Sequence, residues 1–306
     1  MALPILLDAE MNVEGATALC LALGAEALEV RAIVAGGGGV SGEQSVENAK
    51  RLLGALRPRT SPALGRGLDP SSRVERSIAF GADGLSDVDL PAASEPSVES
   101  GADVYRAFLS GDGERAIVTT GALTTLASVL PEIDAKVRER TKVFVFGGAI
   151  WTKGNAGAHA EANFARDPSA AAAVCGAGLS MTIAPLDVTN YIALDASNVA
   201  HLAASGYRTG ELAARLLEPL LEEDGEPSYG RTYVPGLVTV ASAIWPDLFL
   251  KTRMRLDIGE KGADAGRSRP GIGGDKSKHI DLLTAVNAVD LLENMLESLC
   301  HEEFVV

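Results

Sequence analysis

The chain has 306 residues, of which 46% are hydrophobic, 22% charged and only 5% aromatic, and its formal net charge is −14. This composition is typical of a globular protein with an aliphatic core, and α/β folds built on one large sheet commonly reach this length. The negative charge argues against a surface that follows phosphate groups, so we expect neither nucleic acids nor anionic membranes as partners.

Short apolar runs alternate with longer segments of helical periodicity, a pattern typical of successive β-α units in a mainly parallel sheet. Segment 57–96 is rich in Pro, Ser and Gly and is predicted to hold a short strand near Ala63 and loops that reach across a pocket. The other elements expected in this first third are strands at 3–7 and 28–35 and helices at 16–24 and 46–56.

The middle of the chain has the clearest pattern, and it weakens beyond Asp187. We expect a single α/β domain over residues 1–306, with a mainly parallel central sheet and flanking helices. Segment 259–279 is polar and glycine-rich and is predicted to be mobile. The remaining expected elements are helices at 103–110, 122–129 and 167–178, strands at 115–119, 142–146 and 180–184, two helices within 196–222, a polar loop at 223–236, a helical or extended stretch at 237–245, and a strand and a helix within 280–299.

The cysteines and the first residues indicate the cellular compartment in which the protein is expected. Cys20, Cys175 and Cys300 are odd in number, far apart and without CxxC spacing, which predicts buried thiols and neither disulfides nor a zinc site. The start MALPILLDAE has a short apolar stretch with no basic region, which predicts neither a secretory signal nor a membrane span. We therefore expect a cytoplasmic protein.

Three carboxylates follow the first predicted strand. Ligands of parallel sheets bind beyond the carboxyl ends of the strands, where Asp8, Glu10 and Glu14 are expected. Such crowding is costly unless a cation, a proton or a sugar diol lies between the carboxylates. In the alternative interpretation Asp8 caps or braces the loop, and Glu14 stabilises the start of a helix through its dipole.

Amides and a further carboxylate follow two other strands. Asn155, Glu161 and Asn163 lie in the loop GNAGAHAEAN, and such a set can hold adjacent hydroxyl groups. Alternatively the loop caps its own backbone, as Asn often does. The lone His159 is interpreted first as a surface residue and second as an acid. Thr120 ends another strand, where its hydroxyl and carbonyl could face the same pocket.

Four consecutive glycines, residues 36–39, follow the second predicted strand. The segment lacks the Lys and Ser/Thr of a phosphate loop and the acidic partner of a dinucleotide fingerprint. It therefore predicts a tight turn that another part of the chain approaches closely, and a dinucleotide enzyme is poorly supported.

The order of these pieces resembles the inosine-uridine-preferring nucleoside hydrolases, which cleave the N-glycosidic bond of ribonucleosides. The resemblance covers almost the whole chain and implies a nucleoside hydrolase-like fold. LPILLDAEMNVEGATAL stands where that family has a DTDxGxDD loop, VTTGALTTLASVL resembles its Thr-Gly-Leu-Thr-Asn segment, GNAGAHAEANFARDPSAAAAV resembles its ribose loop and DPEAA helix, and IAPLDVTN resembles its GLDVTH.

Family members hold one calcium ion that positions the ribose diol and the attacking water, and an aspartate takes the proton of that water. The resemblance implies Glu10 and Asp8 as catalytic residues. Glu10 and the carbonyl of Thr120 remain as candidate metal ligands, which implies at most weak Ca²⁺ binding and no other cofactor. The residues implied to contact the substrate are Glu14, Asn155, Glu161, Asn163 and Thr120.

Several family residues are replaced in this chain. Gly15 stands at a calcium ligand, and Pro235 and Gly236 stand where a His-Asp pair would supply an acid and the last calcium carboxylate. Calcium usually takes roughly six to eight oxygens, so high affinity is not expected. The other replacements are Ala162 for a phenylalanine, Gly39 for an asparagine and Phe80 for a histidine.

Two functions remain open at this point. The first is hydrolysis of an N-riboside by an altered, calcium-poor or calcium-independent site with Glu10 as base, because glycosidic cleavage needs carboxylates and not necessarily a metal. The second is a catalytically silent relative that binds a nucleoside or another sugar, or acts as a subunit of an assembly. The sequence leaves the oligomeric state open, a homo-oligomer included.

Overall fold

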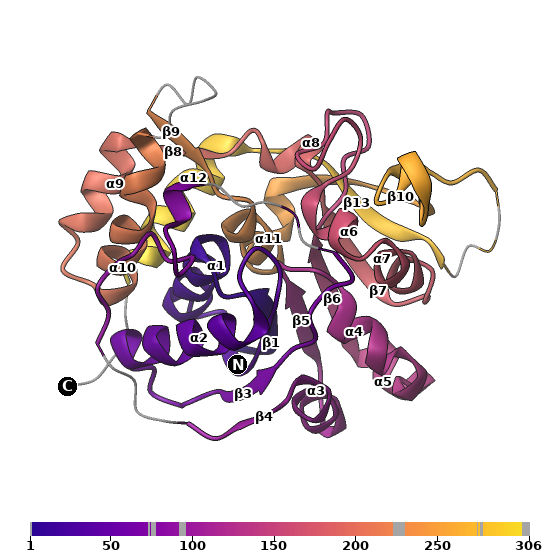
Figure 1. Ribbon diagram of the computed structural model, residues 1–306, viewed down its shortest axis with the longest axis horizontal. Coiled ribbons are helices and arrows are strands. Elements are labelled where there is room, and N and C mark those ends of the chain that lie inside the picture. The colour runs from indigo at the N-terminus through magenta and orange to yellow at the C-terminus, as the bar shows by residue number, and fades with distance from the viewer. Residues whose placement is uncertain are drawn as a thin grey trace.

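A nine-stranded sheet forms the centre of the computed structural model (Figure 1). The structure describes residues 2–72, 74, 78–91, 96–222, 230–273, 275 and 278–301. In the order in which they pair, the strands are β10 (Phe249–Met254), β13 (Ile280–Val286), β7 (Ser180–Ala184), β6 (Thr141–Phe146), β5 (Arg115–Thr119), β1 (Leu3–Glu10), β2 (Leu28–Gly36), β3 (Ala63–Arg66) and β4 (Val98–Ser100). Every neighbouring pair is parallel except β10 with β13, so the expected mainly parallel sheet is confirmed.

Helices cover both faces of this sheet. The described helices are α1 (Val13–Gly24), α2 (Gly42–Leu56), α3 (Gly101–Ser110), α4 (Thr124–Val129), α5 (Ala135–Arg140), α6 (Ala162–Arg166), α7 (Pro168–Cys175), α8 (Leu186–Thr189), α9 (Ala196–Ala203), α10 (Arg208–Leu217), α11 (Pro235–Ile244) and α12 (Ala288–Leu299). In Figure 1, α1, α2 and α9 to α12 gather on one side of the sheet, and α3, α4 and α7 lie on the other.

The two helix layers are separated by the alternation of side chains along the strands. In β1, Ile5 and Leu7 join the core under α1, whereas Leu6 between them joins the core under α3 and α4. This is the period of two that a strand imposes, and a strand buried on both faces must be apolar at every position. The uninterrupted apolar run at the start of the chain satisfies that requirement.

The later part of the chain differs most from the expected elements. The stretch 237–245 is helical, within α11. The expected loop at 223–236 contains β9 (Arg231–Tyr233), which pairs with β8 (Ala193–Asp195), and residues 223–229 lie outside the described residues. Within the segment expected to be mobile, β12 (Ser268–Pro270) pairs with β11 (Leu256–Ile258), and residues 274, 276 and 277 lie outside the described residues.

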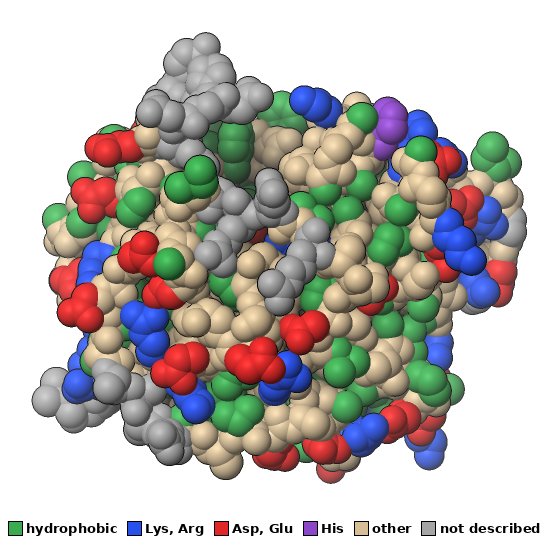
Figure 2. Space-filling view, in the orientation of Figure 1, with side chains coloured by type: hydrophobic (Ala, Val, Ile, Leu, Met, Phe, Trp, Pro, Cys, Tyr) green, Lys and Arg blue, Asp and Glu red, His purple; other side chains and the backbone are tan. Residues whose placement is uncertain are grey.

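The surface and the cysteines complete the description. Acidic and basic side chains are interspersed over the face drawn in Figure 2. Cys20 and Cys175 are buried, as expected, but Cys300 is only half-buried, and no disulfide joins the three in the described part of the chain. None of the helices in the described part of the chain combines the length and apolar character needed to cross a bilayer.

The strand order fixes where a ligand can bind. From β1 in the middle of the sheet the chain builds β2, β3 and β4 on one side, and then returns to place β5 on the other side of β1. The loops that leave β1 and β5 therefore diverge, and in open parallel sheets ligands bind at this point beyond the carboxyl ends of the strands; this region is called the crevice below. Asp8 and Glu10 lie at that end of β1, and Thr119 at that end of β5.

Candidate active site

Glu10, the last residue of β1, has a buried carboxylate with two different neighbours. Its Oε1 accepts a hydrogen bond of 2.7 Å from the backbone N–H of Val40. Its Oε2 lies 3.0 Å from Nη1 of Arg166, which is ion-pair distance, but accepts no hydrogen bond from the described residues. The side chain is therefore fixed at one oxygen and paired with a cation at the other.

Arg166 is the residue that the sequence interpretation missed. It ends α6, its side chain is 9% exposed, and its Nη1 also donates to Oδ1 of Asn163 at 3.1 Å. The hydroxyl groups of Ser71 and Ser72 each donate to its carbonyl at 3.0 Å, which fixes its backbone. Its position directly before the Asp-Pro that starts α7 gives no sign, in sequence, that the guanidinium turns into the crevice.

The glycine run after β2 lets the chain pass close to this pair. A Cβ at Gly38 would lie 2.2 Å from Glu10 Oε2 and 3.2 Å from Cζ of Arg166, and one at Gly37 would lie 2.0 Å from Oδ1 of Asp69. Real Cβ atoms do not approach other atoms so closely, so a side chain at either position would push the Glu10 or Asp69 carboxylate aside. The predicted close approach is confirmed.

Asp8 precedes Glu10 by two residues in β1, so the alternation of the strand directs both side chains toward the same face. Its Oδ2 accepts a hydrogen bond of 2.7 Å from the hydroxyl of Tyr105 in α3, and both side chains are buried. Burial raises the pKa of Asp8 to about 7, and the Tyr105 hydrogen bond opposes that rise. The carboxyl is thus poised to exchange a proton near neutral pH.

Glu14 stands in the first turn of α1 and is half-buried. Burial raises its pKa to about 7, Arg166 opposes the rise, and Glu10 and Glu161 add to it. The helix is capped by Asn12, whose Oδ1 accepts from the N–H groups of residues 14 and 15. Asp8 therefore does not cap the helix, and Glu14 belongs to the same group of interacting charges as Glu10 and Glu161.

The loop after β6 contributes a second buried pair, Glu161 and Asn163. Glu161 caps α6, accepting from the N–H groups of Asn163 at 2.8 Å and Phe164 at 3.2 Å; burial raises its pKa, and these hydrogen bonds oppose the rise. Asn163 Nδ2 donates to the carbonyl of Thr120 at 3.2 Å, which ties the loop to β5. Both residues serve the local backbone and also face the Arg166 side chain.

Two expected residues of that loop lie apart from the buried group. Asn155 is exposed, and its Oδ1 accepts a 2.8 Å hydrogen bond from the N–H of Ala162, which is the self-capping alternative. His159 is exposed as well. The structure thus brings together Asp8, Glu10, Glu14, Thr120, Glu161 and Asn163, and leaves Asn155 bonded to its own loop.

Several polar atoms of the crevice have no hydrogen-bond partner among the described residues. They are Glu10 Oε2, Arg166 Nε, and the hydroxyl oxygens of Thr119 and Thr120, all buried. Buried polar groups in folded proteins are nearly always satisfied, so these atoms have hydrogen-bonding capacity left for water or for a polar ligand.

Comparison with known proteins connects this geometry to a family. The model of the inosine-uridine preferring nucleoside hydrolase family matches residues 5–293. The chain belongs to this family. A pyrimidine-specific ribonucleoside hydrolase, RihA, from Salmonella agona is 32% identical over 259 residues, covering 81% of this chain and 82% of the relative. The RihA of Salmonella enteritidis is 31% identical over 272 residues, covering 86% of each chain.

Solved structures of nucleoside hydrolases share the fold. A purine-preferring ribonucleoside hydrolase from Gardnerella vaginalis superimposes with a TM-score of 0.87 at 23% identity, covering 97% of this chain and 98% of the other. An inosine-guanosine nucleoside hydrolase superimposes with a TM-score of 0.85 at 21% identity over the full length of both chains. The predicted nucleoside hydrolase fold is confirmed.

Two positions implied to lack a calcium ligand of the family have no room for a side chain. A Cβ at Gly15 would lie 2.1 Å from the carbonyl oxygen of Glu10, and one at Gly236 would lie 2.7 Å from the carbonyl oxygen of Glu14. Both contacts are with backbone, which cannot move aside easily. Glycine at these positions is therefore built into the packing of α1 and α11 around the crevice.

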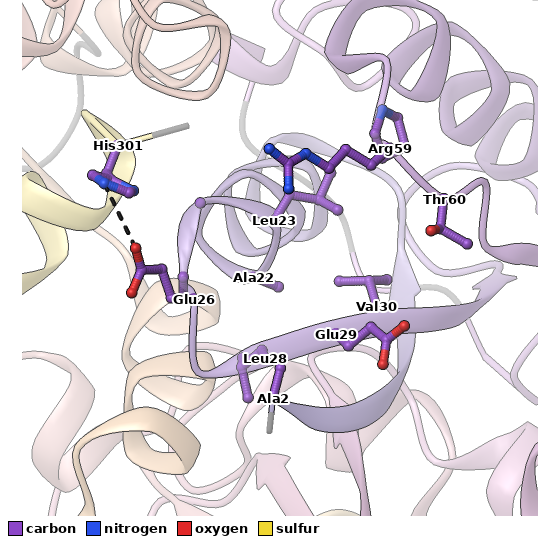
Figure 3. A pocket seen from close by; sticks show the side chains of 13 residues that line it. Ala2, Ala22, Leu23, Glu26, Leu28, Glu29, Val30, Arg59, Thr60 and His301 are labelled. Carbon is purple, nitrogen blue, oxygen red and sulfur yellow. Dashed lines mark ion pairs between the residues drawn. The ribbon is translucent and has the colours of Figure 1, made fainter. Parts of the chain in front are cut away.

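A second cavity, of about 420 Å³, lies at the opposite end of the sheet (Figure 3). Ala2, Leu28 and the end of α1 line it, so it borders the amino ends of β1 and β2. His301 and Glu26 point toward one another there, 3.7 Å apart. Because ligands of parallel sheets bind at the carboxyl ends, the crevice beside Glu10 is the candidate active site.

Proposed function

We propose that this member of the nucleoside hydrolase family hydrolyses the N-glycosidic bond of a ribonucleoside or related N-riboside at a site that works without a resident calcium ion. The observation that carries the proposal is the group of buried, unsatisfied polar atoms around Glu10 and Arg166, at the topological switch point between β1 and β5. A ribose, with several hydroxyl groups that both donate and accept, suits such a group.

The proposed reaction assigns a separate role to each residue of the site. Glu10 accepts the proton of a water that attacks the anomeric carbon, the bond from that carbon to the base nitrogen breaks, and the base leaves with the bonding electron pair and takes up a proton from solvent. Positive charge develops on the sugar ring in this step, and the carboxylates of Glu14 and Glu161 stabilise it. Asp8 acts beside Glu10, and its pKa of about 7 suits proton exchange. Asn163 and Thr120 contact the ribose.

The donor set does not fit a calcium ion. Calcium takes roughly six to eight oxygens, mostly from carboxylates and carbonyls. Here Oδ2 of Asp8 is bonded to Tyr105, the Thr120 carbonyl to Asn163, and Glu10 to Val40 and Arg166. Within the described residues, no group of three or more His, Cys, Asp or Glu side chains is arranged to hold a metal. We therefore assign no step of the reaction to a metal.

A nucleoside panel tests the proposed activity. Release of free ribose from purine and pyrimidine ribonucleosides should be measured at high protein concentration, with and without a chelator, because the relatives are pyrimidine-specific and purine-preferring enzymes. We expect release that the chelator does not abolish and that Glu10→Gln lowers by at least about a hundredfold. Glu29→Gln, at a half-buried carboxylate near the start of β2 that pairs with Arg31, serves as the control and should keep full activity.

No ribose release from any member of the panel would contradict the hydrolase assignment. Activity that the chelator abolishes and added calcium restores would contradict the metal-free site.

A second candidate is a catalytically silent relative that binds a nucleoside or sugar. The observation that favours it is the engagement of Glu10, whose carboxylate is held by the Val40 N–H and paired with Arg166. A carboxylate stabilised in its charged form by such neighbours is a weaker base. Calorimetric binding of a nucleoside without any turnover would favour this candidate, and activity lost in Glu10→Gln would exclude it.

A further inference from the structure

The carboxylates of the crevice interact with the guanidinium of Arg166. Its Nη1 lies 3.0 Å from Glu10, and its positive charge opposes the rise that burial causes in the pKa of Glu14 and of Glu161. These three carboxylates come from the end of β1, the first turn of α1 and the N-cap of α6. Elements far apart in the sequence therefore place their negative charges around one guanidinium.

The guanidinium is held in place from several directions. Asn163 accepts from Nη1, Ser71 and Ser72 hold the carbonyl of Arg166, and the Gly38 backbone packs against the guanidinium so closely that a Cβ would lie 3.2 Å from Cζ. With 7% of the residue exposed, water screens its charge little. A cation fixed in this way needs no reorganisation when a ligand arrives.

We propose that Arg166 is the built-in cation of this site and takes the electrostatic place of a divalent metal ion. This proposal rests on the proposed function because it concerns the same site. It differs in concerning which cation balances the carboxylates there. The guanidinium neutralises the carboxylates that would otherwise attract a metal, and it repels any further cation. A covalently attached cation also cannot be withdrawn by a chelator.

Thermal unfolding with and without calcium tests this proposal. Wild type, Arg166→Ala and Arg166→Lys are compared in a chelator and in millimolar CaCl₂, and calcium binding is measured by calorimetry. Arg115→Ala is the matched control, because Arg115 is also buried but its guanidinium donates to backbone carbonyls at the other end of β5. We expect no response of the wild type to calcium. Arg166→Ala should lose stability and regain part of it in CaCl₂, as a rise in Tm of roughly 2–4 °C or more.

The variants separate a charge role from a packing role. Arg166→Lys keeps the charge and should stay indifferent to calcium, and Arg115→Ala should lose stability that calcium does not restore. A wild type that binds calcium or gains Tm in CaCl₂ would overturn the proposal, even if Arg166→Ala does not fold. Equal responses of Arg166→Ala and Arg115→Ala to calcium would also overturn it.

The outcome is independent of turnover. The response to calcium is measured from unfolding, and hydrolysis from ribose release. A protein that shows the expected calcium pattern but cleaves no nucleoside would refute the proposed hydrolysis and leave the role of Arg166 intact. A hydrolase that calcium activates would refute the role of Arg166 and the metal-free site, and would leave the hydrolysis itself standing.

Discussion

The two ends of the central sheet each bury an arginine, and the two arginines meet different partners. At the amino end, Arg115 starts β5 and donates to the backbone carbonyls of Phe108, Gly111 and Gly113. At the carboxyl end, Arg166 lies among side-chain carboxylates. Both residues are less than a tenth exposed, at 3% and 7%.

The two arginines differ in the groups that accept their hydrogen bonds and balance their charge. The three carbonyls at the amino end belong to the last turn of α3 and the turn that follows it, so Arg115 closes a loop by donating from both terminal nitrogens to the backbone, while its Nε has no hydrogen-bond partner among the described residues. Burial lowers the pKa of Arg115, because no carboxylate compensates fully for the lost water. The carboxyl end instead gathers full charges, since Arg166 pairs with the Glu10 carboxylate, and the Nε of Arg166, like that of Arg115, has no hydrogen-bond partner among the described residues. Burial alone thus does not identify a functional arginine, whereas the kind of acceptor does.

The largest expected effect tests whether the ionised carboxylate of Asp8, at the carboxyl end of the sheet, destabilises the folded protein. The pKa of Asp8 is raised from 3.8 to about 7 in the folded protein. As pH rises from about 4 to about 7, the unfolded chain has already released this proton while the folded chain retains it, so this group makes the wild type less stable with rising pH. Asp8→Asn cannot ionise and keeps an acceptor for Tyr105, and it should exceed wild type in stability by roughly 2–4 kcal/mol at pH 8.

Urea unfolding of both proteins between pH 4 and pH 8 measures this effect. The advantage of Asp8→Asn should vanish near pH 4 and level off above pH 7, and the shift of Glu14, common to both proteins, cancels in the difference. Asp112→Asn at the amino end is the control, because its exposed carboxylate lies 3.9 Å from Arg140 and such surface pairs contribute little. A difference that does not change with pH would show that Asp8 is not protonated in the folded protein.

Local sequence patterns predict those parts of the fold that are buried on a regular period. The strands β1, β5 and β6 contain uninterrupted apolar stretches, at residues 5–7, 116–118 and 143–146, because both faces of these strands are covered. Strand β10 reads Phe-Leu-Lys-Thr-Arg-Met and is exposed at most positions. It forms because the neighbouring β13 offers an edge for pairing, and no local pattern reports that.

The candidate site likewise contains residues that the sequence predicts and one, Arg166, that it does not. Asp8, Glu10 and Glu14 could be expected because a strand end fixes their place, and Glu161 and Asn163 because a resemblance to a family marks them. Arg166 ends helix α6; Ser71 and Ser72 hold its backbone carbonyl, and the glycine run packs against its guanidinium, so its position depends on contacts with distant segments. Contacts made across long sequence separations are what the sequence alone does not reveal.

A smaller effect is expected when the ion pair at the carboxyl end is displaced without changing either partner. In Gly38→Ala the new methyl group would lie 2.2 Å from Glu10 Oε2, so the carboxylate must move. A displacement of about an ångström in a catalytic group can cost about a hundredfold in rate, and we expect a fall of that order in kcat with a loss of stability of about 1–3 kcal/mol. Ribose release and urea unfolding measure the two quantities.

The glycine run supplies its own control for this experiment. In Gly36→Ala the nearest atom to the methyl group would be the Leu68 carbonyl oxygen at 3.6 Å, an ordinary contact, so activity should change little. Equal activity of Gly38→Ala and wild type would mean that the position of Glu10 beside Arg166 does not matter for the reaction.

The smallest effect is expected at Asn155, which the family resemblance implies as a substrate contact but which is exposed. Its Oδ1 accepts from the Ala162 N–H at 2.8 Å, so Asn155→Ala removes one hydrogen bond near the start of α6. We expect a loss of about 0.5–1.5 kcal/mol in stability and a change in KM below about threefold. Asn163→Ala, which removes a buried amide bonded to Arg166, should raise KM far more. If instead Asn155→Ala raises KM by tenfold or more with unchanged stability, then the loop closes over the ligand and Asn155 exchanges its backbone partner for a ribose hydroxyl.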